Sequence, residues 1–423
     1  MTNAGGLARA GRRHHAAPVL GLKANWKQFA LLVAVNAFVG GMVGLERSVL
    51  PLLAEAEFGI TSKTAAVSFI ATFGLAKACT NLAAGVLSER FGRRRLLIAG
   101  WVVGMPVPLM IIFAPSWGWV IAANVLLGVN QGLCWSMTVN MKMDLAGPKR
   151  RGTALGLNEA AGYLAVAAAA LLAGVIAEHR GLRPEPFYLG IVFAAAGLAL
   201  SALFVKDTAS HVRAEGGAPG ARHSLRRSFA DATWRRPSLF GVSQAGFVNN
   251  LNDGLAWGVF PLLFASRGLS LGQIAFLAAS YPFAWGGLQL VTGWMSDRTG
   301  RRSLVTAGMF VQGTAIAMAA TVDSFGYWLA ALLALGAGTA LVYPTLIAAI
   351  GDAVTPHARA TTLGVYRFWR DAGAMAGALT GGVLADLFGF GTALYVVALL
   401  TIASGVFAAR TMGSGRAPKE IVG

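Results

Sequence analysis

Residues 85–94 of the chain read GVLSERFGRR, and residues 293–302 repeat this pattern as GWMSDRTGRR. The second copy follows the first at an offset of 208 residues, from 85 to 293. Asp144 and Asp352 stand at the same offset, and each is followed within a few residues by Pro and Arg. A shared offset at separate places in a chain of 423 residues predicts a duplication of one structural unit.

The composition indicates a membrane protein. Hydrophobic residues make up 56% of the chain and charged residues only 13%, whereas a soluble domain carries about 25% charged residues. A helix that crosses a bilayer needs about 20 mostly apolar residues, and a chain of this length has room for many. We therefore predict an all-α polytopic membrane protein, which excludes an ordinary soluble enzyme.

Apolar runs between charged or turn-rich breaks predict twelve membrane spans. These are residues 28–53, 65–88, 96–113, 117–141, 152–177, 186–205, 238–265, 271–295, 303–322, 326–350, 360–385 and 388–409. The polar, glycine-containing stretch in the middle of the chain predicts a flexible linker between two six-helix halves. The predicted parts are an N-terminal segment 1–27, a first bundle 28–205, a linker 206–237, a second bundle 238–409 and a tail 410–423.

The basic residues predict the orientation. If both termini lie on one side, most of the 35 Lys and Arg residues fall in the short segments of that side. The other side receives only Lys63, Arg180, Arg183 and Arg267. Cytoplasmic loops carry such an excess of basic residues, so we expect both termini to lie in the cytoplasm. We expect the protein itself in the plasma membrane, which is the inner membrane in a bacterium. The net charge of +17 is then an orientation signal, and its dispersal argues against a nucleic-acid partner.

The repeated stretch resembles the G-x-L-[SA]-[DE]-R-x-G-R-[RK] loop of the major facilitator superfamily. The first copy fits this pattern throughout, and the second departs from it only where Met295 replaces Leu. With twelve spans and a central linker, the resemblance covers the whole chain. It implies two pseudo-symmetric six-helix bundles that transport a solute by alternating access.

The resemblance also implies that these loops gate the cytoplasmic side. Independently of it, Gly85 would let helices approach closely, Gly92 would permit a tight turn, and the arginines could pair with Asp144. The alternative is that the loop charges only anchor the orientation. The candidate gating residues are Gly85, Glu89, Arg90, Gly92, Arg93 and Asp144, and in the second half Gly293, Asp297, Arg298, Gly300, Arg301 and Asp352.

Eight charged residues fall inside predicted spans, four acids and four bases. Each would cost at least about 2.5–3.5 kcal/mol if it faced lipid at mid-depth, so we expect them to face the protein interior and to pair. Lys77 reads as an interior lysine that faces Glu46 or a helix end. Asp253 has no base nearby in its own helix, and an unpaired buried carboxylate can carry a coupling proton.

The family resemblance implies that the first, fourth, seventh and tenth spans line a central cavity, to which Trp257 and Thr339 would also contribute. Arg367 corresponds to Glu159 by the 208-residue offset, so these two opposite charges could bridge the halves. For Glu46 with Arg47 and for Arg370 with Asp371, a structural ion pair and a substrate contact both remain open. The candidate cavity residues are Glu46, Arg47, Gln131, Trp135, Glu159, Asn249, Asn250, Asp253, Tyr343, Arg367, Arg370 and Asp371.

We predict a monomeric secondary transporter of a small solute, with proton-coupled efflux as the first hypothesis. Asn124 stands where proton-coupled exporters of the family carry an Arg, and residues 156–163 lack the Gly-Pro pair of those exporters. Both differences weaken the inference of proton coupling from that subgroup. Uniport or symport of a small metabolite and a non-transporting membrane receptor or assembly protein are the alternatives. All six His fall outside the spans, and no span contains a metal or nucleophile-base constellation, so we expect no enzyme, cofactor or metal.

Overall fold

The computed structural model describes residues 20–146, 151–214, 225–354 and 356–413, and this part is helical with no strand. Its first half contains α1 (Trp26–Ala56), α2 (Lys63–Ala66), α3 (Ser68–Phe91), α4 (Arg93–Gly104), α5 (Pro106–Ile112), α6 (Trp117–Ala146), α7 (Arg151–Arg180) and α8 (Glu185–Leu203). Its second half contains α11 (Pro237–Ser266), α12 (Leu271–Thr299), α13 (Arg301–Ala319), α14 (Phe325–Ala353) and α15 (Pro356–Thr411). Between them lie α9 (Ala209–Ala214), α10 (Leu225–Ala230) and a π-helix, η2 (Asp231–Arg235).

The helices follow the predicted spans closely, with local breaks where the backbone turns. The second span is divided into α2 and α3, and Pro106 begins α5 inside the third span. The eleventh and twelfth spans are joined in α15, which bends at Gly389, where φ is +82°. Glycine adopts this left-handed region without a steric penalty, so Gly389 turns the chain back between two antiparallel arms.

Eight helices of the described part are long and apolar enough to cross a membrane. The two arms of α15 count once among them, and α3, α11 and α13 are not included. In α11 the reason is a group of polar side chains, among them Asn249, Asn252 and Asp253, all of which are buried. Polar residues that face the protein interior lower a span's hydropathy without exposing charge to lipid. The predicted number of twelve spans counts these three helices and both arms of α15.

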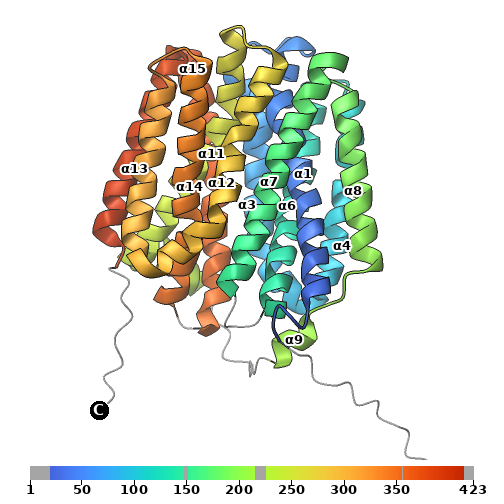
Figure 1. Cartoon of the computed structure of the whole chain (residues 1–423), viewed down its shortest axis with the longest axis vertical. Helices are drawn as coiled ribbons and strands as arrows, with labels where there is room; N and C mark the ends of the chain where they lie inside the picture. Colours follow the sequence, from blue (N-terminus) through green and yellow to red (C-terminus); the bar gives the residue numbers. More distant parts are fainter. Residues whose placement is uncertain (1–19, 147–150, 215–224, 355, 414–423) are drawn as a thin grey trace, which may run out of the picture.

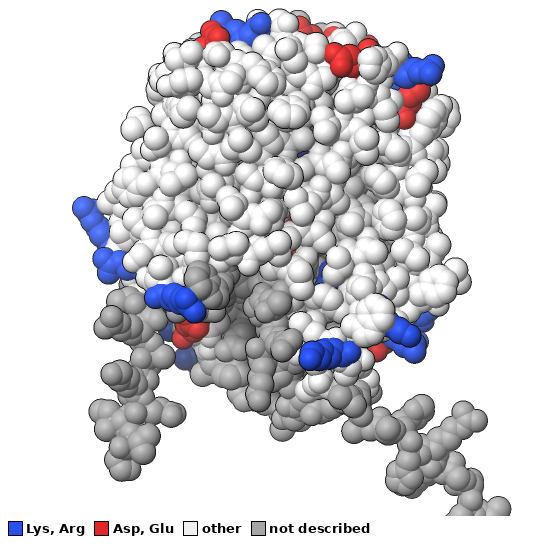
Figure 2. All heavy atoms as spheres, in the orientation of Figure 1, with Lys and Arg blue, Asp and Glu red and all other residues white. Residues whose placement is uncertain are grey.

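The chain is an all-α polytopic membrane protein. On the face drawn in Figure 2, charged side chains gather at the two ends of the molecule, and a broad uncharged band lies between them. Large apolar side chains are exposed on the molecule, including Phe113, Phe283 and Leu399. An exposed apolar belt of this kind suits a hydrocarbon environment.

The two halves stand side by side with their helices roughly parallel to the long axis (Figure 1). Between the halves, α3 packs along α15, and α7 packs along α12. We call the end that carries α9 the linker face and the other end the distal face. Helix α1 begins and α15 ends at the linker face (Figure 1).

Candidate functional site

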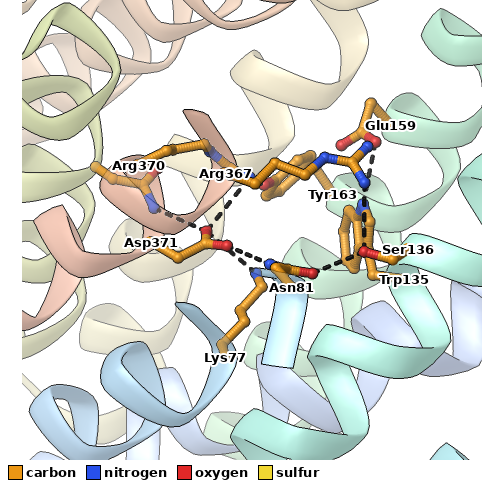
Figure 3. A network of polar contacts seen from close by, with 10 residues as sticks. Lys77, Asn81, Trp135, Ser136, Glu159, Tyr163, Arg367, Arg370 and Asp371 are labelled. Carbon is orange, nitrogen blue, oxygen red and sulfur yellow. Dashed lines mark hydrogen bonds and ion pairs between the residues drawn. The ribbon is translucent and has the colours of Figure 1, made fainter. Parts of the chain in front are cut away.

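A buried polar cluster joins the halves near the middle of the membrane spans, and its hub is Asp371 of α15 (Figure 3). One Asp371 oxygen lies 3.9 Å from the Lys77 ammonium and 3.4 Å from an Arg370 nitrogen. Asn81 of α3 and Asn250 of α11 both donate hydrogen bonds to the same carboxylate. A single fully buried acid therefore holds groups from both halves.

Arg367 extends the cluster toward α6. Its guanidinium donates to the Ser136 hydroxyl at 3.3 Å, and Ser136 donates to the Asn81 amide oxygen at 2.7 Å. Glu159 of α7 accepts instead from the indole N–H of Trp135 at 3.0 Å and from Asn158 at 2.9 Å. Arg367 thus crosses between the halves through Ser136, and the hydrogen bonds of Glu159 run to its own half.

Aromatic rings close the cluster on the α7 and α14 sides. Arg370 donates to the Tyr163 hydroxyl at 3.1 Å and lies 4.2 Å from the centre of the Tyr343 ring. Tyr163 stacks on Trp285 of α12 with ring centres 3.5 Å apart. The Arg370 charge is therefore shared among a carboxylate, a phenol and a ring face, which suits a cation that must stay charged in a dry interior.

Asp253 lies in a second, smaller group. The Tyr281 hydroxyl of α12 donates to its carboxylate and lies 3.2 Å from the Thr339 hydroxyl of α14. The sequence had left Asp253 without a partner, and the structure supplies one from another helix. The acid is 1% exposed, so it is removed from solvent in this conformation.

Glu46 and Arg47 point to different neighbours, as adjacent helical residues must. Glu46 lies against Asn124 of α6, whereas the Arg47 guanidinium lies among aromatic rings, 4.8 Å from Phe73 and 4.6 Å from Trp257. The two residues make no salt bridge with each other in the described part of the chain.

Lys77 was predicted to face Glu46 or a helix end, but it lies beside Asp371 of the other half. Three further interior residues also differ from their predicted settings. Gln131 donates to the Val39 carbonyl at 2.9 Å, and Asn249 accepts from Gln312 at 2.9 Å, so each is bonded within its own half. Lys142, which the sequence placed in a loop, is fully buried and donates to the Leu32 carbonyl at 3.0 Å. The predicted balance of four interior acids and four bases is therefore wrong by this one additional cation.

The candidate gating loops lie at the linker face and have the same backbone geometry in both halves. Arg93 lies 3.0 Å from Asp144, and Arg301 lies 3.1 Å from Asp352. Asp144 also accepts a hydrogen bond from Thr208, just before α9, at 2.6 Å. Arg90 and Arg298 are exposed, Gly293 is within α12, and the side chains of Glu89 and Asp297 lie outside the described part.

Gly92 and Gly300 separate the paired helices of each loop. Their φ and ψ angles are +83° and 154° for Gly92, and +90° and 143° for Gly300. Almost only glycine occupies this region. A Cβ on Gly85 would meet nothing within 4 Å, so the close helix approach predicted at Gly85 is absent in this conformation.

At the distal face the halves are connected by a contact that the sequence did not suggest. Asp386 of α15 accepts hydrogen bonds from Ser62, Lys63 and Thr64 at the first turn of α2. Beside it, a Cβ on Gly382 would come within 2.8 Å of the Thr64 Cα. The halves are therefore in close contact at this end.

Sequence reasoning missed Asn81, Ser136 and Tyr163, which are uncharged. One signal was available for Asn81, because it follows Lys77 by four residues and so shares its helix face. Tyr163 carried no such signal, since its role depends on Arg370 of the other half.

The sequence model of the Major Facilitator Superfamily matches residues 29–246 and again residues 242–421. The chain belongs to this superfamily. An uncharacterized MFS-type transporter of Salmonella typhimurium is 25% identical over 377 residues, which cover 80% of this chain and 86% of that protein. A probable 4-methylmuconolactone transporter of Cupriavidus pinatubonensis is 30% identical over 230 residues, about half of each chain (52% and 51%).

The fold of this major facilitator protein is also similar to a solved structure. The human organic anion transporter MFSD10 (TETRAN) superposes with a TM-score of 0.71 at 16% identity, covering 90% of this chain and 99% of that one. At this identity the likeness concerns the fold alone. As a member of the superfamily, the protein is a membrane transporter that binds a small-molecule substrate within the lipid bilayer.

Proposed function

We propose that this transporter is a monomeric secondary transporter that moves a small organic solute by alternating access of its two halves. The observation that carries the proposal is the cluster around Asp371, where buried charges of both halves meet at mid-depth. Buried ion pairs whose partners lie on separate bodies can be exchanged when those bodies move. The 4-methylmuconolactone named for one relative is consistent with a small organic solute.

The linker face is proposed to be cytoplasmic, in a bacterial inner membrane, because the basic segments gather there. On this assignment the distal face is the outer one. The Asp386 contact closes the outer face, whereas Gly85 and Gly364, in helices that face each other near the linker end, have no atoms within 4 Å of an added Cβ. These two features support an inward-facing or inward-occluded conformation. The gating loops would then come together in the outward-facing state.

A proton is the proposed coupling ion, and Asp253 is the proposed carrier. Its carboxylate is buried with Tyr281 and Thr339 between α11, α12 and α14, so movement of these helices would change its access to water. The direction of proton-coupled transport that we propose first is efflux, with symport of a metabolite as the second candidate.

The test uses purified protein in proteoliposomes that contain a pH-sensitive dye. Addition of a transported solute should change the internal pH for the wild type, and Asp253→Asn should abolish this change while solute exchange at equal pH continues. Asp323→Asn, at an exposed surface acid, is the matched control and should behave as the wild type. Unchanged proton movement in Asp253→Asn would overturn the coupling assignment.

A receptor or assembly role predicts a different result. In that case Ser62 and Asp386 could be cross-linked without loss of cellular function, because no change of conformation would be needed. The repeated gating loops with ion pairs in both halves favour the transporter, since a static scaffold has no use for two such pairs.

A further inference from the structure

Arg47 of α1 is a buried cation whose hydrogen-bond donors have no partner. The side chain is 1% exposed, and Nε, Nη1 and Nη2 all lack a hydrogen-bond partner in the described part of the chain. A buried guanidinium is normally paired, because an unpartnered buried charge is costly. The other interior cations do have partners. Lys77, Arg367 and Arg370 are bonded within the Asp371 cluster, and Lys142 donates to a carbonyl.

Aromatic rings surround Arg47 and leave its donors available. The guanidinium carbon lies 4.6 Å from the centre of the Trp257 ring, 4.8 Å from Phe73 and 6.0 Å from Phe69. Rings stabilise a guanidinium through its face, whereas its N–H donors lie in its plane in a rigid fork. These rings therefore hold the cation without using the donors that match a carboxylate.

A second unpartnered donor lies in the same contact. The indole Nε1 of Trp257 is buried and has no hydrogen-bond partner in the described part. Trp257 belongs to α11 in the second half, whereas Arg47 belongs to α1 in the first half. Two oxygen atoms of one small anion could accept from both residues and so connect the two halves.

The carboxylates near Arg47 do not take this role. Glu46 and Asp253 act on Arg47 electrostatically, but neither accepts a hydrogen bond from it. Glu46 lies against Asn124, and one of its own oxygens also lacks a partner. Asp253 accepts from Tyr281. These two acids therefore stabilise the positive charge of Arg47 at a distance, and they leave its N–H groups for another acceptor.

We propose that Arg47 and Trp257 form a binding site for the carboxylate of a small organic acid whose apolar body packs against Phe69 and Phe73. This inference names the substrate class of the proposed transporter and rests on that function. A singly charged carboxylate suits the site, because all three guanidinium nitrogens of Arg47 lack a partner in the described part of the chain. The rings of Phe69, Phe73 and Trp257 lie beside the cation and offer apolar surface to the body of the acid. A doubly charged phosphate would require further cations that are engaged elsewhere.

Binding is tested on the purified full-length protein by thermal shift and by the fluorescence of its tryptophans. The probes are benzoate, phenylacetate, cyclohexanecarboxylate and acetate, each compared with the neutral amide of the same skeleton. A ligand that binds only the folded state raises the unfolding midpoint. We expect at least one carboxylate with an apolar body to give a saturable shift. Its amide should bind more weakly by about tenfold or more, because it loses one charge-assisted hydrogen bond.

Arg47→Gln should lower the affinity for that carboxylate by about tenfold to a hundredfold and should leave the weak affinity for the amide unchanged. Arg47→Lys keeps the charge without the fork, so its affinity should fall between those of the wild type and Arg47→Gln. If Arg47→Gln does not fold, the Lys variant and Trp257→Phe, which keeps a ring but removes the indole N–H, still test the site. Lys142→Gln removes another buried cation and should bind as the wild type.

Three outcomes would overturn the inference: equal binding of acids and amides, undiminished carboxylate binding by Arg47→Gln, and the absence of a shift with all four carboxylates. Failure of the proposed function would look different. In that case the carboxylate would bind and depend on Arg47, yet proteoliposomes would neither accumulate nor exchange it. Transport that continues with Arg47→Gln at wild-type affinity would instead leave the transporter intact and remove the carboxylate site.

Discussion

Asp386 accepts two hydrogen bonds from Thr64, 2.9 Å from the backbone nitrogen and 2.7 Å from the hydroxyl, and these bonds connect the two halves at the distal face. The same carboxylate also accepts from Ser62 and Lys63. It therefore satisfies the free N–H groups at the start of α2, as an N-terminal cap does within a single helix. Because the cap comes from the other half, separation of the halves exposes both partners.

A disulfide across this contact should stop transport. In a Cys79→Ser, Cys134→Ser background, Ser62→Cys with Asp386→Cys replaces two side chains that lie 2.8 Å apart. Oxidation should abolish turnover in proteoliposomes, and a reductant should restore it. The control is Arg267→Cys with Asp323→Cys, an exposed pair 3.2 Å apart within the second half. Full activity of the oxidised Ser62–Asp386 variant would show that the distal face does not open.

The distal contact should be insensitive to pH in the physiological range. Partial burial raises the pKa of Asp386, but the hydrogen bonds from Thr64, Lys63 and Ser62 outweigh it and lower the pKa to about 2, from an ordinary 3.8. The charged form is the bonded one, so the contact is fully present above about pH 4 and is lost as the pH falls through about 2.

In an Asp253→Asn background, which removes the proposed proton carrier, spin labels at Thr61→Cys and Phe388→Cys, both exposed at this face, should therefore report one distance distribution from pH 8 to pH 5. Asp386→Asn, which cannot accept from the same donors as a carboxylate, should broaden the distribution toward longer distances at every pH. A midpoint between pH 5 and 7 in the Asp253→Asn background would contradict the assignment.

Asp371→Asn should strongly destabilise the protein. It leaves Lys77 and Arg370 without the carboxylate that lies 3.9 and 3.4 Å away, and removal of one partner from a buried ion pair costs about 3–5 kcal/mol. The measurement is the free energy of unfolding in detergent. Addition of Lys77→Met to Asp371→Asn should recover part of the loss.

The matched comparison is Asp323→Asn at the surface pair with Arg267, whose side chains are 53% and 49% exposed. Exposed pairs contribute about 0–1 kcal/mol. Equal effects of Asp371→Asn and Asp323→Asn would mean that the buried cluster relaxes around the loss.

Two glycines of α15 should respond oppositely to alanine. A Cβ on Gly382 would lie 2.8 Å from the Thr64 Cα, whereas a Cβ on Gly364 would meet nothing within 4 Å. Gly382→Ala should therefore lower the unfolding free energy by about 1–3 kcal/mol through overpacking. Gly364→Ala should raise it by about 0.5–1 kcal/mol, because alanine is the better helix residue.

The transport rate of Gly364→Ala should also change, although its stability does not fall. If the linker ends of α3 and α15 approach each other in the outward-facing state, Gly364→Ala should slow turnover without loss of stability. Normal turnover of Gly364→Ala would argue against such an approach at this position.

The sequence predicted the helical architecture well because its signals are local. Apolar run length and a repeated ten-residue pattern are properties of neighbouring residues, and helix ends such as Gly92 and Gly300 follow from them. The loop arginines also led to the pair with Asp144. The pair of Arg301 with Asp352, which stands at the same offset in the second half, was found only in the structure.

The partners of the interior charges could not be predicted in this way. Asp253 is bonded to Tyr281, and Arg367 to Ser136, through helix contacts that no spacing along the chain encodes. Lys142 was placed in a loop because hydropathy ends the span before it, yet its side chain turns inward to a carbonyl of α1. Asp386 was overlooked because an exposed acid at a helix end carries no signal of a partner more than 300 residues away.

The left-handed turns at Gly92 and Gly300 have a consequence for directed evolution of this protein. Both positions adopt angles that a residue with a Cβ almost never adopts. In a library randomised across residues 85–94 and 293–302, selection for any new solute would recover glycine at 92 and 300. The neighbouring positions would diversify, so these two glycines would still identify the loops after the other residues of the pattern had been replaced.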